Sequence, residues 1–230
     1  MIGRYLWIPM LGLFLVGCGS GEPAPRLRSA PAPALLAGWT TWDRPGFSLA
    51  APDNWSPYRR RRIRQQAPPE EGLGSGGLPP EVMSEVNSMA DAFDAAGQKE
   101  DEAEIAALAK EGIPLRLYDN SVRALPAETP TQLTVKVTQE GGLNFETEAK
   151  NLFNKLNVDK KTQSKVELPV GAAQEFVTET TNRIGDVVHQ ILYLLVDGEN
   201  RYVFTFISTN DASTIRQVAR PIMETFRPKP

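Results

Sequence analysis

The sequence predicts an α+β fold, a mostly antiparallel sheet with helices on both faces in an α/β/α sandwich. Apolar runs separated by turn residues fill positions 162–208, and Asp197-Gly198 is a strong signal for a tight hairpin. Residues 191–196 are apolar at every position, as expected of a strand that is covered on both faces. Apolar stripes at helical spacing precede and follow this region, so helices are available for each face.

The first half of the folded chain is expected to hold one short strand, a loop and a helical insertion. The strand is predicted at 47–51, and the proline and glycine content of the following stretch predicts a flexible loop at 59–80. Helices are expected at 81–111, with an interruption at Gly97 and a C-cap at Gly112. The apolar stripe of the first helix consists of Val82, Val86, Met89 and Phe93.

The second half is expected to combine a meander of strands with two amphipathic helices. The last helix begins after a cap at Asn210 or Asp211 and contains Pro221. In chain order we predict strands at 113–118 and 132–138, a helix at 145–156, a three-stranded meander at 162–181, 187–196 and 201–208, and the final helix. The first strand of the meander is expected to be interrupted at Pro169 and Gly171.

Residues 1–17 are expected to be a lipoprotein signal peptide. One basic residue precedes an apolar run at 6–16, which as a helix would span about 16 Å, roughly half of a bilayer core. Such a run is typical of a secretory leader and too short for a transmembrane helix. It ends in a segment that resembles the bacterial lipobox, in which the signal peptidase would recognise Leu15, Val16 and Gly17 before Cys18.

Cys18 is the only cysteine, and we expect it to become the acylated N-terminus of the mature chain. Several acyl chains hold a protein stably at a membrane. The alternative is an uncleaved or conventionally cleaved leader in which the thiol has no role. Lipidation would make the membrane a partner and place the domain in the periplasm or at the cell exterior, with the inner and outer membranes both left open.

Residues 18–38 are rich in proline and alanine and are expected to be a tether. Fully extended, some twenty residues would reach about 60 Å. A single domain is expected over 39–230, with the insertion at about 59–111.

Seven residues near the start of the domain are candidates for contacts with a partner. Trp39 and Trp42 either cover a sheet edge or form an exposed patch, whereas Trp55 is expected in the core. The basic run that follows either touches anionic headgroups or is the solvated end of a strand. The seven candidates are Trp39, Trp42, Arg59, Arg60, Arg61, Arg62 and Arg64.

Several stretches of this sequence resemble the Mog1/PsbP-like superfamily, including its bacterial lipoprotein branches. They are FSLAAPDNW, GIPLRLYDNS, TQLTVKV, NFETEAKNLFNKL, LPVGAAQEF, ILYLLVDGENRYVFTFIS and METFRP, within about residues 45–228. The resemblance implies the sandwich fold and a function that is generally not enzymatic, such as protein binding. The arginine-rich loop and the helical insertion depart from the photosynthetic members, so no photosystem role is carried over.

No catalytic residues, metal site or cofactor are expected from the sequence. His189 is the only histidine, it falls within a strand, and no GxSxG elbow accompanies it. The acidic run at 99–104 is expected to be a solvated helix start. The net charge of −3 gives no basic footprint for a nucleic acid.

Three functions are compatible with these features. The first is a non-enzymatic, membrane-anchored envelope lipoprotein that binds an envelope protein or aids assembly. The alternative is a carrier of a small apolar or lipid ligand, which would need a dry pocket larger than about 300 Å³ between the sheet and the helical insertion. The third is a hydrolase, which would need His189 buried beside a carboxylate and a hydroxyl.

Overall fold

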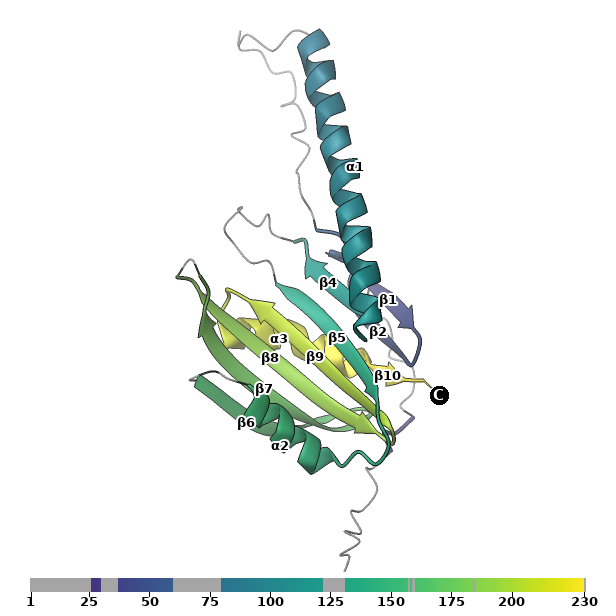
Figure 1. The fold of residues 1–230 in the computed structure, drawn as a ribbon, viewed down its shortest axis with the longest axis vertical. Helices are drawn as coiled ribbons and strands as arrows, with labels where there is room; N and C mark the ends of the chain where they lie inside the picture. The colour runs from purple at the N-terminus through teal and green to yellow at the C-terminus, as the bar shows by residue number, and fades with distance from the viewer. Residues whose placement is uncertain are drawn as a thin grey trace, which may run out of the picture.

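The computed structural model describes residues 26–29, 37–59, 80–121, 131–156, 158, 160–183 and 185–229, and it confirms the α+β class (Figure 1). The elements in chain order are β1 (Trp39–Arg44), β2 (Phe47–Pro52), β3 (Trp55–Ser56), α1 (Pro80–Lys110), β4 (Leu115–Asp119), β5 (Gln132–Gln139), α2 (Phe145–Lys155), β6 (Lys160–Leu168), β7 (Gly171–Thr181), β8 (Val187–Asp197), β9 (Asn200–Ser208), α3 (Ala212–Thr225) and β10 (Arg227–Pro228).

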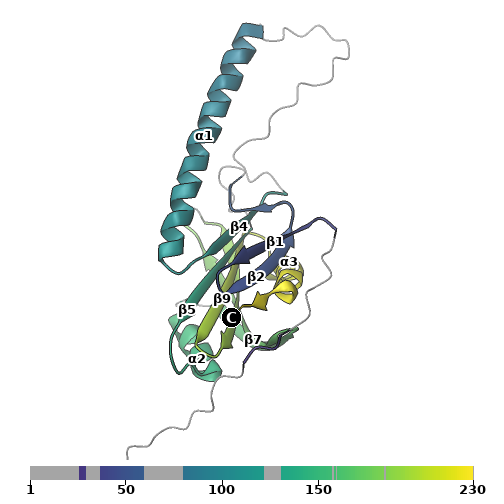
Figure 2. The ribbon, with the colours of Figure 1, turned by 90° about the vertical axis from the view of Figure 1, so that its right-hand side faces the viewer.

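A seven-stranded antiparallel sheet forms the centre of the molecule, in the order β3-β4-β5-β9-β8-β7-β6. Helices α1 and α2 lie on one face of it and α3 on the other (Figures 1 and 2). A second sheet, β1-β2-β10, lies on the α3 side and was not expected from the sequence. It closes because the chain that leaves α3 pairs Arg227 with Ser48 of β2.

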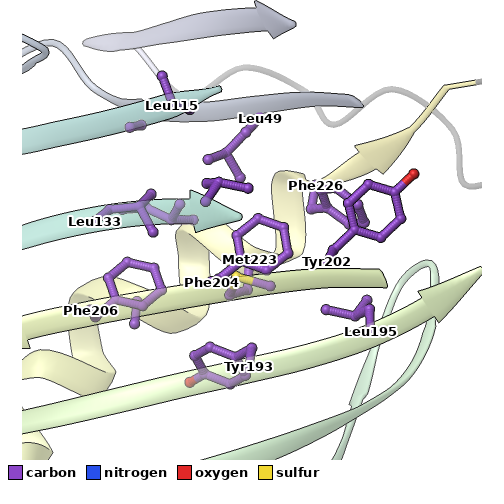
Figure 3. Packing of buried hydrophobic residues seen from close by; sticks show 14 of the residues in the cluster. Leu49, Leu115, Leu133, Tyr193, Leu195, Tyr202, Phe204, Phe206, Met223 and Phe226 are labelled. Carbon is purple, nitrogen blue, oxygen red and sulfur yellow. The ribbon is translucent and has the colours of Figure 1, made fainter. Parts of the chain in front are cut away.

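The main core fills the space between the large sheet, α3 and the small sheet (Figure 3). Phe226 lies at its centre, with ring centroids 4.9 Å from Phe204, 5.1 Å from Tyr202 and 6.1 Å from Phe47. The alternation of β8 explains the two faces, since Tyr193 and its odd-numbered neighbours join this core and the even-numbered ones face α2. The residues of the smaller α2 core are Leu143, Ala149, Phe176, Leu192, Leu194 and Val196.

The stretch 162–181, expected as one interrupted strand, forms two strands, β6 and β7. Leu168 pairs directly with Gly171, so Pro169 and Val170 are the turn of a hairpin and the meander has four strands. β6 is an edge of the large sheet, and the side chains of Lys160 and Lys165 on it are 73% and 63% exposed.

Helix α1 runs without a break through Gly97, where an interruption was expected. Helix propensity opposes glycine by only about 1 kcal/mol, and good helix formers on both sides outweigh that cost. The helix ends as predicted at Gly112, which has φ +78°. The amides of Gly112 and Ile113 donate to the carbonyls of Ala109 and Leu108, a Schellman motif that satisfies the last carbonyl groups.

The two shorter helices begin at side-chain caps. Asn144 Oδ1 accepts from the Thr147 amide at 3.0 Å at the start of α2. At the start of α3, Asp211 Oδ1 accepts from the amides of Ser213 and Thr214 at 2.8 and 3.0 Å. Each cap satisfies amides that have no partner within the first helical turn.

Candidate interaction site at the base of α1

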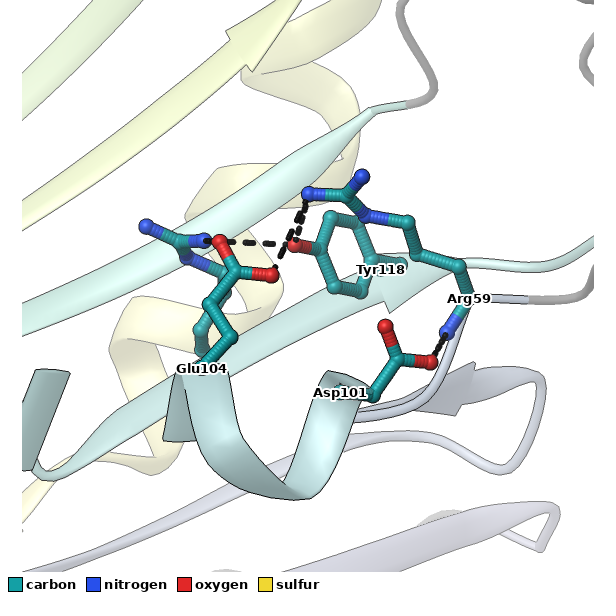
Figure 4. Close-up of polar contacts among 5 residues, drawn as sticks. Arg59, Asp101, Glu104 and Tyr118 are labelled. Carbon is teal, nitrogen blue, oxygen red and sulfur yellow. Dashed lines mark hydrogen bonds and ion pairs between the residues drawn. The ribbon is translucent and has the colours of Figure 1, made fainter. Parts of the chain in front are cut away.

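Five polar residues from three elements meet where α1 crosses the large sheet (Figure 4). They are Arg59, which follows β3, Asp101 and Glu104 on α1, and Arg116 and Tyr118 on β4. Asp101 and Glu104 share one face of the helix because they are three residues apart. Arg116 and Tyr118 share one face of the strand because they are two residues apart.

Arg59 joins the helix to the strand through its backbone and its side chain. Its amide donates to Asp101 Oδ2 at 3.3 Å, and its Nη2 donates to the Tyr118 hydroxyl at 3.0 Å. The same Nη2 lies 3.4 Å from Glu104 Oε2. The guanidinium carbon also lies 4.9 Å from the centre of the Tyr118 ring, in cation–π range.

Arg116 approaches Glu104 from the sheet. Its Nη1 donates to Glu104 Oε1 and, at 3.3 Å, to the Tyr118 hydroxyl. Glu104 therefore lies between two guanidinium groups. The buried Nε of Arg116 has no hydrogen-bond partner in the part of the chain that the structure describes.

The electrostatics of the cluster favour the charged form of Arg59. Partial burial alone would lower the pKa of Arg59, but the hydrogen bond to Tyr118 and the charges of Glu104 and Asp101 raise this pKa above its ordinary value. Two cations and two carboxylates also leave the cluster without net charge. The arrangement therefore fastens α1 to the sheet and offers no excess charge to an ion.

Most of α1 extends beyond this cluster. At 1.5 Å per residue, Pro80 lies about 31 Å along the helix axis from Asp101. The views in Figures 1 and 2 show this part of the helix projecting from the end of the body. Met89, on the projecting part, is 58% exposed.

The predicted tryptophan candidates lie on β1, and both pack partly against the main core. The guanidinium of Arg44 lies 5.6 Å from the centre of the Trp42 ring, and Trp42 Nε1 has no partner among the described residues. Trp55 is 2% exposed, as expected. Of the arginine candidates, Arg59 belongs to the cluster at the base of α1.

The remaining predicted site residues lie outside the described residues. They are Leu15, Val16, Gly17 and Cys18 of the predicted lipobox, and Arg60, Arg61, Arg62 and Arg64 of the basic run. Their roles stay predictions.

His189 is half-buried on β8, between Glu179 and Ser208 on the neighbouring strands. The Glu179 carboxylate binds Lys160 at 2.5 Å, and the Ser208 hydroxyl lies 2.8 Å from Thr131 Oγ1. Among the described residues, no side-chain hydrogen bond joins the His189 imidazole to either of these side chains. Across the same residues, no group of three His, Cys, Asp or Glu side chains could hold a metal ion.

Sequence reasoning missed four of the five cluster residues. Asp101 and Glu104 belong to the acidic run that was expected to be a solvated helix start, yet Asp101 is 4% exposed. Their i, i+3 spacing was the available signal. Nothing local indicates that Arg116 and Tyr118 face them, because that contact depends on the crossing of α1 over β4.

Two cavities lie at the other end of the body from the projecting helix, and residues 26–29 contribute to both. The larger has a volume of about 530 Å³, and most of its lining residues are polar or charged, among them Asp197, Glu199 and Lys229. The smaller, of about 200 Å³, includes Phe145, Val170 and Val196.

No helix among the described residues is long and apolar enough to cross a membrane.

Comparisons with known proteins give distant likenesses of structure. No protein-family model matches the sequence, and the search of curated proteins gives no match. A protein from Bacteroides thetaiotaomicron matches with a TM-score of 0.47 and 9% identity over 85% of this chain, which spans 50% of that protein. PA94, a protein of unknown function from Pseudomonas aeruginosa, matches with a TM-score of 0.38 and 14% identity over 47% of this chain and 80% of its own. LpqN, involved in cell envelope biogenesis of Mycobacterium tuberculosis, matches with a TM-score of 0.44 and 13% identity over 84% of this chain and 91% of its own.

Proposed function

We propose that this chain is a membrane-anchored envelope lipoprotein that binds a protein partner or aids assembly, without enzymatic activity. The lipobox at residues 15–18 supports the anchor. The projecting helix α1 is the observation that carries the binding role, and we propose that it is the contact surface.

Helix α1 is attached to the body differently from a helix of the core. A helix that served only the core would pack along its length, as α3 does with Ile215, Ala219 and Ile222. In α1 a set of ion pairs and hydrogen bonds fixes the C-terminal end, so the projecting part has a defined direction. A helix whose direction is fixed in advance loses less conformational entropy when it binds a partner.

The cavities give the carrier hypothesis little support. The cavity of about 530 Å³ is lined mainly by polar and charged residues, whereas a small apolar ligand needs an apolar lining. The carrier hypothesis requires a pocket between the sheet and α1, but both cavities lie away from α1.

The anchor is tested by Cys18→Ser in the full chain. We expect this variant to lose metabolic labelling by fatty acid and to move from the membrane to the soluble fraction, because the thiol that accepts the lipid is missing. Unchanged membrane partition of the variant would overturn the anchor.

The binding role is tested with a photo-crosslinking amino acid placed at Met89 in the native envelope. The control position is Glu199, which is exposed at the other end of the body. We expect Met89 and the nearby exposed Ala92 to crosslink to the same protein by mass spectrometry, and Glu199 not to do so. Identical crosslinks from Met89 and Glu199, or none from α1, would contradict the role of the helix.

A further inference from the structure

Residues 26–29, within the stretch expected to be a free tether, lie against the folded body. The Arg28 amide donates to the Val170 carbonyl at 2.6 Å, and the Leu27 amide donates to Asp197 Oδ1 at 3.0 Å. The Leu27 side chain is half-buried and packs against the main core. Two hydrogen bonds from backbone amides, one to the Val170 carbonyl and one to the Asp197 carboxylate, and one apolar side chain thus hold this segment at the β6–β7 and β8–β9 turns.

The body is shaped to receive Leu27. Gly171 has φ +139°, and a Cβ atom built on it would lie 3.3 Å from Leu27 Cδ2. Any larger residue would be strained there and would crowd the leucine. The cavities of about 200 and 530 Å³ both include Leu27 in their linings, so this side chain lies between them.

We propose that residues 26–29 form an N-terminal strap, docked between the two turns, which holds the body close to the anchor in a fixed orientation. This inference rests on the proposed lipidation of Cys18. With the strap docked, only eight residue steps separate Cys18 from Arg26, a reach of about 25 Å when extended. With the strap released, the tether would run to the start of β1 and reach about 60 Å.

The docked strap also fixes which end of the body faces the membrane. Its contacts are at the β6–β7 and β8–β9 turns, and α1 projects from the other end (Figures 1 and 2). The turns would therefore face the lipid, and the helix would point away from it. In this orientation, α1 would bind its proposed partner on the side of the body that faces away from the anchoring membrane.

The first test measures amide hydrogen exchange at Leu27 and Arg28 in the full-length Cys18→Ser chain, which needs no lipid. We expect both amides to be protected and Leu27→Asp to reduce their protection by about tenfold or more, because a carboxylate does not fit an apolar site. The matched control is Ser29→Asp, which adds the same charge at an exposed position and should leave protection unchanged. Unprotected amides in the parent, or equal losses in both variants, would overturn the strap.

The second test measures the orientation of the lipidated chain on vesicles. Acylation consumes the only natural thiol, so a fluorophore can be attached to a cysteine introduced at Glu199 or Met89. We expect stronger energy transfer from Glu199 than from Met89 to an acceptor in the bilayer, and Leu27→Asp should reduce the difference. Equal transfer from both positions in the parent would overturn the orientation. Failure of lipidation instead shows as loss of vesicle binding, with the amide protection intact.

Discussion

Helices α3 and α1 pack on opposite faces of the same sheet, and they are held in different ways. α3 buries Ile215, Ala219, Ile222 and Met223, and its side chains are part of the main core. α1 is more than twice as long, yet the contacts that its described side chains make with the sheet lie near its C-terminal end and include charged groups. The stability of the body therefore depends on α3, whereas α1 adds mainly solvent-exposed surface.

Polar contacts also differ between the two helices. Arg216 of α3 donates from Nη2 to Glu175 Oε1 on β7 at 2.8 Å. Tyr193 of β8 donates from Oη to Glu175 Oε2, also at 2.8 Å. Burial acts to raise the pKa of Glu175, but these hydrogen bonds and the arginine charges outweigh it and lower this pKa below its ordinary value. Burial and the Glu175 carboxylate together raise the pKa of the Tyr193 hydroxyl. The α3 contact thus surrounds a 4% exposed carboxylate, while the Arg59 and Glu104 side chains of the α1 contact are 48% and 40% exposed.

The largest expected difference comes from the same substitution in each helix. Met223→Ala in α3 removes a fully buried side chain and should lower the free energy of unfolding by about 2 to 5 kcal/mol. Met89→Ala in α1 changes a side chain that is 58% exposed and should alter it by less than about 0.5 kcal/mol. Chemical denaturation of the two variants measures both values. Equal losses would show that α1 belongs to the core.

The next effect depends on pH and tests the Glu175 contact. Because the pKa of Glu175 is lower in the folded state, its contribution to stability is present above the unfolded value of 4.5 and is lost as pH falls through the folded value. Glu175→Gln should cost about 1 to 3 kcal/mol at pH 7, and this difference from the parent should shrink below pH 4.5.

The matched control for this variant is Glu224→Gln. Glu224 forms an exposed ion pair with Arg220 on the same helix, which contributes little. Unfolding curves between pH 7 and pH 3 give the comparison. A cost of Glu175→Gln that does not change with pH would argue against an ionised Glu175 in the folded state.

The smallest expected effect is at the base of α1. Glu104→Gln removes the charge that faces Arg59 and Arg116 and should cost about 1 kcal/mol or less. We expect the change to show as faster hydrogen exchange in α1, with the midpoint of global unfolding nearly unchanged, because α1 opens more easily than the core. Glu102→Gln, at an exposed position on the same helix, should leave exchange unaffected.

The parts of the fold that depend on neighbouring residues could be predicted from the sequence. The caps at Asp211 and Gly112 and the hairpin at Asp197-Gly198 are each decided within a few residues. The alternation of β5 and the stripe of α2 were found for the same reason. The Pro169-Val170 turn was mistaken for an interruption, because a break and a hairpin use the same residue types.

The contacts that could not be predicted join distant parts of the chain. The Leu27 amide meets Asp197 across 170 positions, and β10 pairs with β2 although Arg227 and Ser48 are 179 positions apart. Leu27 lies in a stretch rich in proline and alanine that has no hydrophobic periodicity, so the sequence around it gives no sign of a docking site. The meeting of Arg59 with Tyr118 likewise depends on the pairing of β3 with β4, which no local spacing encodes.

The edges of the large sheet matter for a chain confined to a membrane surface as proposed. Confinement to two dimensions raises the local concentration, so sheet edges of neighbouring copies would collide often. One edge is β3, only two residues long, and the other is β6, whose Lys160 and Lys165 are paired with Glu179 and Glu146. Strand pairing between two β6 edges would have to desolvate these charged pairs. The β3 edge is too short to offer more than a few backbone hydrogen bonds to another strand. Under the proposed anchoring, both edges would therefore disfavour strand pairing between neighbouring copies at high surface density.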